Sequence, residues 1–461
     1  MSLKIKEIFT VFILSIGIFL FVIDLFIINV SLPTIQKTLS LNNHQSQWII
    51  ILYIIGYTSV LINAGKAGAF FGYKKLYVMG ILGFTFASLV CGLSTNFYIL
   101  LIGRFLQGIS SGFMVPQGLT LIIQLFEKEE KKAVALGIYG SIAGVASVLG
   151  QLLGGLLPDI TLLNESWRLI FLINIPLGCV AVLIAQLKIS KSEIVEKVKL
   201  SFLPMIQVFI LLIGLIYPLI IGPELDLPFW CIGLLIVFVI LIILFLKNEK
   251  EQSDKTQSAL INFKLFKNKV FNFGLFAALA YYMVQDAYFI VNANYLQNFK
   301  HLSPTTTGIA FFYQGIGYVL ASLIVGKYVQ NHAKNVLLIG LSIMIIGLFF
   351  HLLLLNHDHL NLYYIHALFF FYGLGCGTVL PLLMTSALKD IPKNLIGVGS
   401  AIYLTVQQIS ICLGIAIVVG IYFQSNHLPF YVLQNLSTAY GLVIIVSIAL
   451  LLVVAGLTCK N

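Results

Sequence analysis

The chain has 461 residues, of which 59% are hydrophobic and only 10% carry a charge. A soluble domain has about 25% charged residues, so this composition excludes a soluble globular protein and indicates a polytopic membrane protein. The formal net charge is +10, but the lysines fall in short segments between apolar spans. They form no contiguous basic face, so we expect the lipid bilayer rather than nucleic acid as the partner.

Fourteen apolar spans are predicted along the chain, each long enough to cross a bilayer as a helix. They lie at residues 8–32, 48–67, 76–93, 97–122, 133–157, 167–187, 202–221, 228–247, 270–297, 305–327, 335–354, 362–386, 395–423 and 438–459. Their connections are short, which makes neighbouring spans antiparallel. The first span shows no small-residue cleavage site, so we expect it to be a retained helix and not a signal peptide.

The basic residues predict the topology. With the N-terminus inside, only Lys37, Arg168 and Lys300 fall outside and Arg104 lies within a span, so all but four of the 27 lysine and arginine residues lie on the cytoplasmic side. Membrane proteins concentrate lysine and arginine on that side. We therefore expect a multi-pass protein of the plasma membrane with both termini cytoplasmic.

Spans one to six and nine to fourteen form two halves of six, and spans seven and eight form a hairpin inserted between them. The predicted domains are an N-terminal six-helix bundle (1–187), a cytoplasmic linker (188–201), an inserted two-helix hairpin (202–247), a second cytoplasmic linker (248–269) and a C-terminal six-helix bundle (270–461). Two six-helix halves describe a common transporter architecture, in which the substrate site lies near the middle of the membrane.

Asp24 lies in the first span with apolar sequence on both sides. An ionisable group inside such a span costs roughly 3 kcal/mol on insertion scales and usually faces a cavity or a partner. We therefore interpret Asp24 as a functional group. A protonated acid that is hydrogen-bonded between helices is the structural alternative.

The fourth span carries a polar face. Residues with i, i+3, i+4, i+7 spacing share one side of a helix, and here they are Arg104, Gln107, Gly108 and Ser111. Arg104 is one of only two arginines beside 25 lysines, and its planar fork can hold several oxygens at once. We predict that Arg104 contacts Asp24 or a substrate, and that Gln107 and Ser111 bind substrate. A structural arginine satisfied by backbone carbonyls is the alternative.

Glycines recur in the fifth span and in the turn at Gly65–Lys75, which joins the second and third spans. Small residues four apart let helices approach closely and slide, so these positions predict conformational gating. The candidate gating residues are Gly65, Gly72, Lys74, Lys75, Gly144, Gly150, Gly154 and Gly155. Close helix packing alone would also account for the glycines, and anchoring on the cytoplasmic side would account for the lysines.

The ninth span contains the second acid that lies well within a predicted span, Asp286. Tyr282, Met283 and Phe289 stand at i−4, i−3 and i+3 from it. Aromatic faces attract cations and a carboxylate supplies a counter-ion, so this face predicts a binding site for a lipophilic cation. Asp286 could instead carry a proton, or be a hydrogen-bonded structural acid.

The remaining polar residues give weaker signals. We interpret His366 in the twelfth span as a packing residue and Gln407 in the thirteenth as a substrate-binding residue that lines a cavity. His357 and His359 lie on a predicted outside turn and are expected to be solvated rather than to bind a metal. The six cysteines lack metal-ligand or disulfide spacing, and no nucleophile, metal or phosphate motif indicates an enzyme.

Several motifs resemble those of one transporter family over almost the whole chain. They are a first-helix signature at Asp24–Pro33, a fourth-helix motif at Gly103–Gly108, a fifth-helix antiporter motif at Gly150–Gly155 with Gln151 where proline is usual, the group-specific segment Trp167–Pro176, and second-half signatures at Tyr295–Gln297 and Gly397–Gln408. The chain resembles the major facilitator superfamily, in its fourteen-helix drug:proton antiporter group, which includes multidrug and tetracycline-type efflux proteins of Gram-positive bacteria.

One departure from the family pattern lies in the turn between the second and third spans. Ala69 and Phe70 stand where the family usually has an Asp and an Arg. In the family these charges help to lock the cytoplasmic side in one state, so the resemblance implies a different gate or a weakened exchange in this chain.

The resemblance implies an all-α major facilitator fold of two six-helix bundles plus an inserted hairpin. It implies proton-coupled efflux of small amphipathic, cationic, drug-like compounds by alternating access, with the proton gradient as the energy source, no cofactor, and a functional monomer. Asp24 and Arg104 would couple transport to protons. The alternatives are an exporter of an endogenous metabolite, siderophore, lipid or amphipathic acid, and, from another class, a membrane enzyme or a non-transporting sensor.

Overall fold

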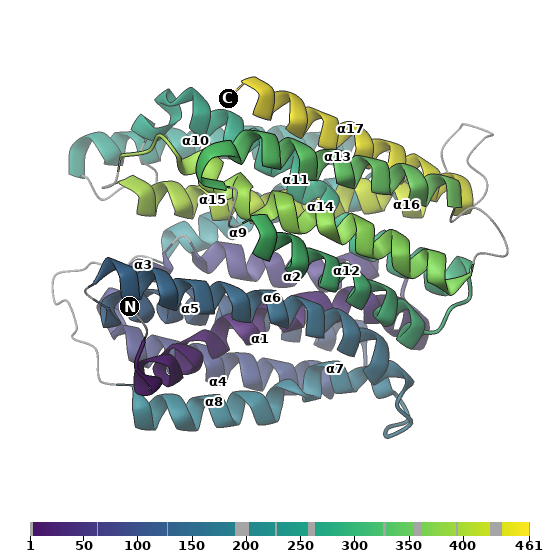
Figure 1. The fold of residues 1–461 in the computed structure, drawn as a ribbon, viewed down its shortest axis with the longest axis horizontal. Helices are drawn as coiled ribbons and strands as arrows, with labels where there is room; N and C mark the ends of the chain where they lie inside the picture. The colour runs from purple at the N-terminus through teal and green to yellow at the C-terminus, as the bar shows by residue number, and fades with distance from the viewer. Residues whose placement is uncertain are drawn as a thin grey trace. The chain divides into compact units, whose positions relative to one another are not determined.

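The computed structural model describes residues 3–61, 63–126, 128–189, 202–225, 228–256, 263–325, 329–354, 361–392, 395–424 and 436–460. Over these ranges the chain is helical and contains no β-strand. It forms two compact units, Met1–Ile210 and Leu211–Asn461. Figure 1 shows that the long helices of each unit run side by side.

The first unit contains the spans of the N-terminal half. Its helices are α1 (Ile5–Thr38), α2 (Asn43–Leu61), α3 (Ala64–Phe71), α4 (Tyr73–Gly92), α5 (Phe97–Leu125), α6 (Glu129–Asp159), the short η1 (Ser166–Arg168) and α7 (Leu169–Leu172), and α8 (Asn174–Lys188). Helix α9 (Leu203–Ile221) crosses the boundary between the units.

The second unit contains the remaining helices. They are η2 (Pro223–Leu225), α10 (Phe229–Thr256), η3 (Phe263–Lys267), α11 (Lys269–Asn294), the π-helical η4 (Tyr295–Phe299), α12 (Pro304–Val325), α13 (Val329–Leu354), α14 (Leu362–Leu388), α15 (Ile396–Leu413), the π-helical η6 (Gly414–Val419), α16 (Gly420–Gln424) and α17 (Leu436–Lys460).

Thirteen of the described helices are long and apolar enough to cross a membrane. A fourteenth span results if α2 and α3, whose axes differ by 59°, are counted together. This agrees with the fourteen predicted spans. The expected turn at residues 65–75 is wrong in one respect: the residues before Gly72 form the helix α3, and Gly72 alone, with a φ of 89°, makes the junction to α4. Such a φ is accessible to glycine without strain.

The two units repeat one packing order. In the first unit α1 packs on α6, and both α2 and α4 pack on α5. In the second unit α11 packs on α15, and both α12 and α13 pack on α14. The first helix of each half therefore lies against the fifth, and the second and third lie against the fourth, which confirms the predicted fold of two six-helix bundles.

The boundaries of the predicted domains stay a prediction. The division between the units falls within α9, and most of the linker predicted at 188–201 lies outside the described residues. Helix α10 continues to Thr256 and so includes the first residues of the linker predicted at 248–269. Lys, Glu and Gln favour the helical state, which explains why a polar segment extends the helix.

Candidate functional site

Asp24 lies at the centre of a polar cluster inside the first unit and is entirely buried. Its Oδ1 accepts hydrogen bonds from Gln107 Nε2 at 3.0 Å and from Asn174 Nδ2 at 3.2 Å. Its Oδ2 accepts a hydrogen bond from Arg104 Nη1, which completes an ion pair. Three donors from α5 and α8 therefore surround the carboxylate, an arrangement that stabilises its ionised form.

Arg104 is also entirely buried and uses several of its donors. Nη1 donates to Gln107 Oε1 at 2.9 Å and Nε donates to the Ile49 carbonyl oxygen at 3.1 Å. Its guanidinium carbon lies 4.2 Å from the centroid of the Tyr53 ring, in a cation–π contact. The predicted contact between Arg104 and Asp24 is confirmed, and the alternative is partly right as well, because one backbone carbonyl helps to hold the guanidinium.

The other polar residues of α5 separate into two groups. Gln107 joins the cluster fully: its Nε2 also donates to Ser88 Oγ at 2.8 Å, and its Oε1 lies 3.4 Å from the Cys91 thiol that donates to it. Ser111, one turn further, contacts the Tyr53 hydroxyl at 3.3 Å. The structure thus places Gln107 against the predicted proton-coupling pair, whereas Ser111 does not touch it. Their substrate-binding role stays a prediction.

Glycines bring the backbones around Asp24 close together. A Cβ at Gly150 of α6 would lie 2.7 Å from the Ile23 carbonyl oxygen, and one at Gly154 would lie 2.3 Å from the Ile27 carbonyl oxygen. Only glycine allows such an approach. At Gly108 of α5 an added Cβ would lie 2.1 Å from a carbonyl oxygen of α2. The glycines therefore fix the helices on either side of the acid.

Asn174 reaches Asp24 from the sixth span, which is one helical stretch from Ser166 to Lys188. The short α7 ends at Leu172, and α8 begins at Asn174 and contains Pro176 near its start. Proline has no N–H to bond the carbonyl four residues earlier, so one helical hydrogen bond is missing where α7 meets α8, although Ile173 between them keeps helical φ and ψ. Asn174 is 1% exposed, and its Oδ1 has no hydrogen-bond partner in the part of the chain that the structure describes. Sequence reasoning included this residue in a motif but did not place it beside Asp24.

The other predicted acid, Asp286 of α11, lies in the second unit and is 5% exposed. Within the described part of the chain no hydrogen bond or ion pair holds its carboxylate. The ring of Tyr282 lies 6.4 Å from that of Tyr403 on α15, and the ring of Phe289 lies 5.4 Å from that of Phe311 on α12. The two aromatic residues predicted to frame Asp286 therefore pack against different helices.

Met283, the third residue of the predicted cation site, is also buried. Its carbonyl oxygen lies 2.3 Å from the position of a Cβ added at Gly414. Gly414 is the first residue of η6, a π-helical segment, and such segments often mark functional sites. The turn of α11 that carries Asp286 is thus closely approached by a glycine, as the turn of α1 that carries Asp24 is.

A second polar face of α11 was missed by sequence reasoning. Its residues recur at i, i+4, i+7 and i+11 and are Tyr281, Gln285, Tyr288 and Asn292. Tyr288 donates its hydroxyl proton to Nε2 of the buried His351 at 2.9 Å, since Nδ1 of His351 donates to the Gly347 carbonyl. The i, i+4, i+7 spacing would have identified the face, but not its partner on α13.

Residues with weaker predictions are placed as follows. His366 stacks on Tyr313 with ring centroids 4.6 Å apart, as expected of a packing residue, and Gln407 is half-buried. His357 and His359 lie outside the described residues. All six cysteines are free. Over the described ranges no group of three or more His, Cys, Asp or Glu residues could hold a metal ion.

The predicted gating residues have different environments. An added Cβ at Gly65 would meet no described atom within 4 Å, whereas Gly72 has the positive φ described above. Lys74 Nζ donates to the Gln186 carbonyl oxygen at 2.9 Å near the end of α8, and Lys75 is exposed. Gly144 is half-buried and Gly155 is buried. Whether any of these residues gates transport stays a prediction.

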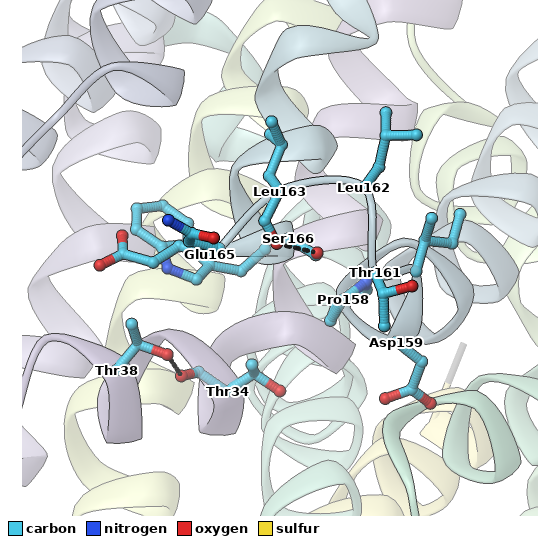
Figure 2. A pocket seen from close by; sticks show the side chains of 12 residues that line it. Thr34, Thr38, Pro158, Asp159, Thr161, Leu162, Leu163, Glu165 and Ser166 are labelled. Carbon is cyan, nitrogen blue, oxygen red and sulfur yellow. Dashed lines mark hydrogen bonds between the residues drawn. The ribbon is translucent and has the colours of Figure 1, made fainter.

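A pocket of about 460 Å³ lies where α1 and α6 end. Figure 2 shows Thr34 and Thr38 on one side and the segment from Pro158 to Ser166 on the other. The Thr38 hydroxyl donates to the Thr34 carbonyl at 2.9 Å, and Glu165 pairs with Arg168. At 1.5 Å per residue of helix, Thr34 lies about 15 Å along α1 from Asp24, so the pocket is separate from the Asp24 cluster.

Comparisons with known proteins agree with this architecture. The chain is 29% identical over 414 residues to the riboflavin transporter RibZ of Clostridioides difficile, covering 90% of this chain and 88% of the relative. It is 27% identical over 356 residues to the drug efflux pump JefA of Mycobacterium tuberculosis, covering 76% of this chain and 68% of the relative.

A solved structure has the same fold. It is a bacterial homolog to the human lysosomal transporter Spinster, with a TM-score of 0.70, 15% sequence identity and coverage of 99% of this chain and 97% of the other. The model of the Major Facilitator Superfamily matches residues 14–202 and again 201–415. This multi-pass membrane transporter therefore belongs to the Major Facilitator Superfamily.

Proposed function

We propose that the protein exports small amphipathic cations in exchange for protons, by alternating access. The observation that carries this proposal is the buried ion pair between Asp24 and Arg104, because an acid held inside a membrane-spanning bundle is the group that an incoming proton would neutralise. The similarity to a protein named as a drug efflux pump supports the direction and the class of substrate.

The coupling follows from the energetics of the pair. While Asp24 is ionised, its charge compensates that of Arg104. Removing one partner of a buried pair costs about 3–5 kcal/mol, because the remaining charge is left uncompensated. A proton on Asp24 has the same effect as removing its charge, so it destabilises this packing of α1, α5 and α8 and favours another conformation. Deprotonation restores the pair and resets the cycle.

Asp286 is the proposed counter-ion of the substrate. It is a nearly buried carboxylate without an ion-pair partner among the described residues, and an unpaired charge in such surroundings is costly. A lipophilic cation would compensate it, and the aromatic ring of Tyr282 would add a cation–π attraction. The two acids then have separate tasks: Asp24 binds the proton and Asp286 binds the substrate.

The test is substrate-dependent proton movement in proteoliposomes. A pH gradient is imposed across the membrane, and a lipophilic cation such as tetraphenylphosphonium is added with a pH-sensitive dye inside. We expect cation accumulation that requires the gradient and proton flux in the opposite direction. The proposal would be contradicted if uptake of the cation were the same with and without the pH gradient and no proton flux accompanied it.

Transport of an endogenous metabolite is the second candidate function. The similarity to a protein named as a riboflavin transporter favours it. The same proteoliposomes distinguish the two: gradient-driven movement of riboflavin, with none of tetraphenylphosphonium, would assign the protein to metabolite transport.

We also propose that the protein resides in the plasma membrane as a functional monomer with both termini cytoplasmic. The distribution of lysines supports this orientation. Single cysteines placed at each end of a cysteine-free variant, labelled with a membrane-impermeant maleimide on intact cells, test it. Labelling before lysis would contradict the orientation.

A further inference from the structure

The groups around Asp24 are matched to its ionised form and not to its protonated form. Arg104 Nη1, Gln107 Nε2 and Asn174 Nδ2 all donate to the carboxylate. A protonated acid also needs an acceptor for its own O–H, and the present contacts supply none. Protonation of Asp24 therefore requires that one of these partners changes from donor to acceptor.

Gln107 is held in its present orientation at both ends of its amide. Its Nε2 donates to Asp24 and Ser88, and its Oε1 accepts from Arg104 and Cys91. Rotating this amide by half a turn would place a donor against two donors and an acceptor against the carboxylate. Arg104 has no acceptor to offer. Neither residue can provide the missing acceptor without breaking several bonds.

Asn174 is free to change. Its Nδ2 makes the bond to Asp24, while its Oδ1 is buried and makes no hydrogen bond to any described residue. The two ends of an amide have nearly the same size, so rotation about Cβ–Cγ needs no extra space. In either orientation one end lacks a partner, so the two orientations differ mainly in which atom faces Asp24.

We propose that the Asn174 side chain is an amide switch, whose orientation changes with the protonation state of Asp24. With Asp24 ionised, Nδ2 donates to Oδ1 of the carboxylate. With Asp24 protonated, the amide rotates and Asn174 Oδ1 accepts the proton-bearing O–H of Asp24. Asn174 is a positioning residue in this scheme, and the inference rests on the proposed function, in which Asp24 carries the proton.

The switch acts inside a defined electrostatic setting. The charged and titratable groups that face Asp24 are Arg104 on α5, Tyr53 on α2 and Cys91 on α4. Helix α6 presents its glycine backbone there, and α8 presents the neutral amide of Asn174. Asn174 is the first residue of α8.

The test is pH-difference infrared spectroscopy on the full-length protein in lipid, with ¹³C-labelled asparagine. Acidification should produce a carboxylic-acid C=O band that is lost in Asp24→Asn, and a shift of a side-chain amide C=O band that is lost in both Asp24→Asn and Asn174→Leu. Asn29→Leu is the matched control, since the Asn29 amide is buried on α1 and neither its Nδ2 nor its Oδ1 has a hydrogen-bond partner among the described residues. It should leave both bands in place.

The outcomes separate the two proposals. If the acid band depends on Asp24 but no amide band depends on Asn174, the switch is wrong and the proposed function stands. If no acid band depends on Asp24, the proposed function fails, and the switch fails with it.

For transport, Asn174→Leu should slow acid-driven exchange at least about tenfold. Asn174→Ser keeps a hydroxyl that donates and accepts, and it should retain most of the exchange with a normal pH profile; loss equal to that of Asn174→Leu would overturn the switch.

Discussion

Asp24 and Asp286 lie on the first helix of their respective bundles, α1 and α11, and both are buried, yet their surroundings are opposite. Asp24 accepts three hydrogen bonds and pairs with Arg104. Asp286 has no such partner among the described residues, and the residues that share its helix face by spacing are Tyr282, Met283 and Phe289. A carboxylate whose hydrogen bonds are made to protein groups is suited to switching, because protonation of the carboxylate disrupts those bonds. A carboxylate without such bonds is suited to binding a cationic ligand, because the ligand supplies the compensating charge.

The backbone contacts of the two acids are alike. Gly150 and Gly154 of α6 approach the α1 backbone on either side of Asp24, and Gly414 approaches the α11 backbone at Met283. In each bundle the acid therefore sits where the first helix meets the fifth. The difference between the sites arises from side chains of the fourth and sixth helices of the first bundle, which bond Asp24. Among the described residues of the second bundle no side chain bonds Asp286 in this way.

The largest effect is expected from Asp24→Asn. The amide keeps the size of the side chain but cannot bind a proton reversibly, so gradient-driven export should be abolished while the protein stays folded in the membrane. Asp390→Asn, at an exposed acid, is the control and should export normally. Uphill export by Asp24→Asn would remove the distinction between the two acids.

Arg104→Lys should have the next largest effect. Lysine keeps the charge but loses the planar fork, and with it the bonds to the Ile49 carbonyl and to Gln107. Each hydrogen bond to a charged group contributes about 1.5–3 kcal/mol, so we expect a loss of transport of about tenfold or more. Export rates normalised to membrane-inserted protein measure it, and near-normal activity would mean that charge alone holds Asp24.

Asp286→Asn should have a selective effect. If Asp286 is the counter-ion, export of tetraphenylphosphonium should fall far more than export of a neutral substrate, and Asp286→Glu should restore part of it. Equal loss for both substrates would make Asp286 a second proton carrier. Reduced membrane-inserted protein with normal transport per molecule would make it a structural acid.

The sequence predicts the first site better than the second for a physical reason. An unpaired charge at Asp24 or at Arg104 would cost free energy inside a membrane. Because both residues lie on helices of one bundle, their sequence positions predict that they pair with each other. The contribution of Asn174 depends on how α8 packs against α1, which cannot be calculated from spacing alone.

Around Asp286 the helical spacing groups Tyr282, Met283 and Phe289, but it does not say which helices they face. The structure places Tyr403 beside Tyr282 and Phe311 beside Phe289. His351 was missed altogether, because a single histidine in an apolar span produces no periodic pattern. Pairings between helices are decided by tertiary packing, to which a single sequence gives only indirect access.

The smallest effects are expected at the glycines behind the acids. Ala at Gly154 or Gly414 would place a methyl group 2.3 Å from a carbonyl oxygen, and overpacking of this kind costs about 1–3 kcal/mol. We expect a lower melting temperature of the purified protein in both variants. Gly140→Ala is the control, since an added Cβ there meets no atom of the described residues within 4 Å, and it should melt like the unmodified protein.

Transport by the same variants separates packing from gating. If Gly154 only packs α6 against α1, Gly154→Ala should lose transport in proportion to the folded protein that is lost. If the α1–α6 interface also slides during transport, turnover per folded molecule should fall as well, because the added methyl group obstructs the motion next to Asp24. A normal turnover in Gly154→Ala would exclude sliding at this interface. The same measurement on Gly414→Ala shows whether the bundle that holds Asp286 behaves differently.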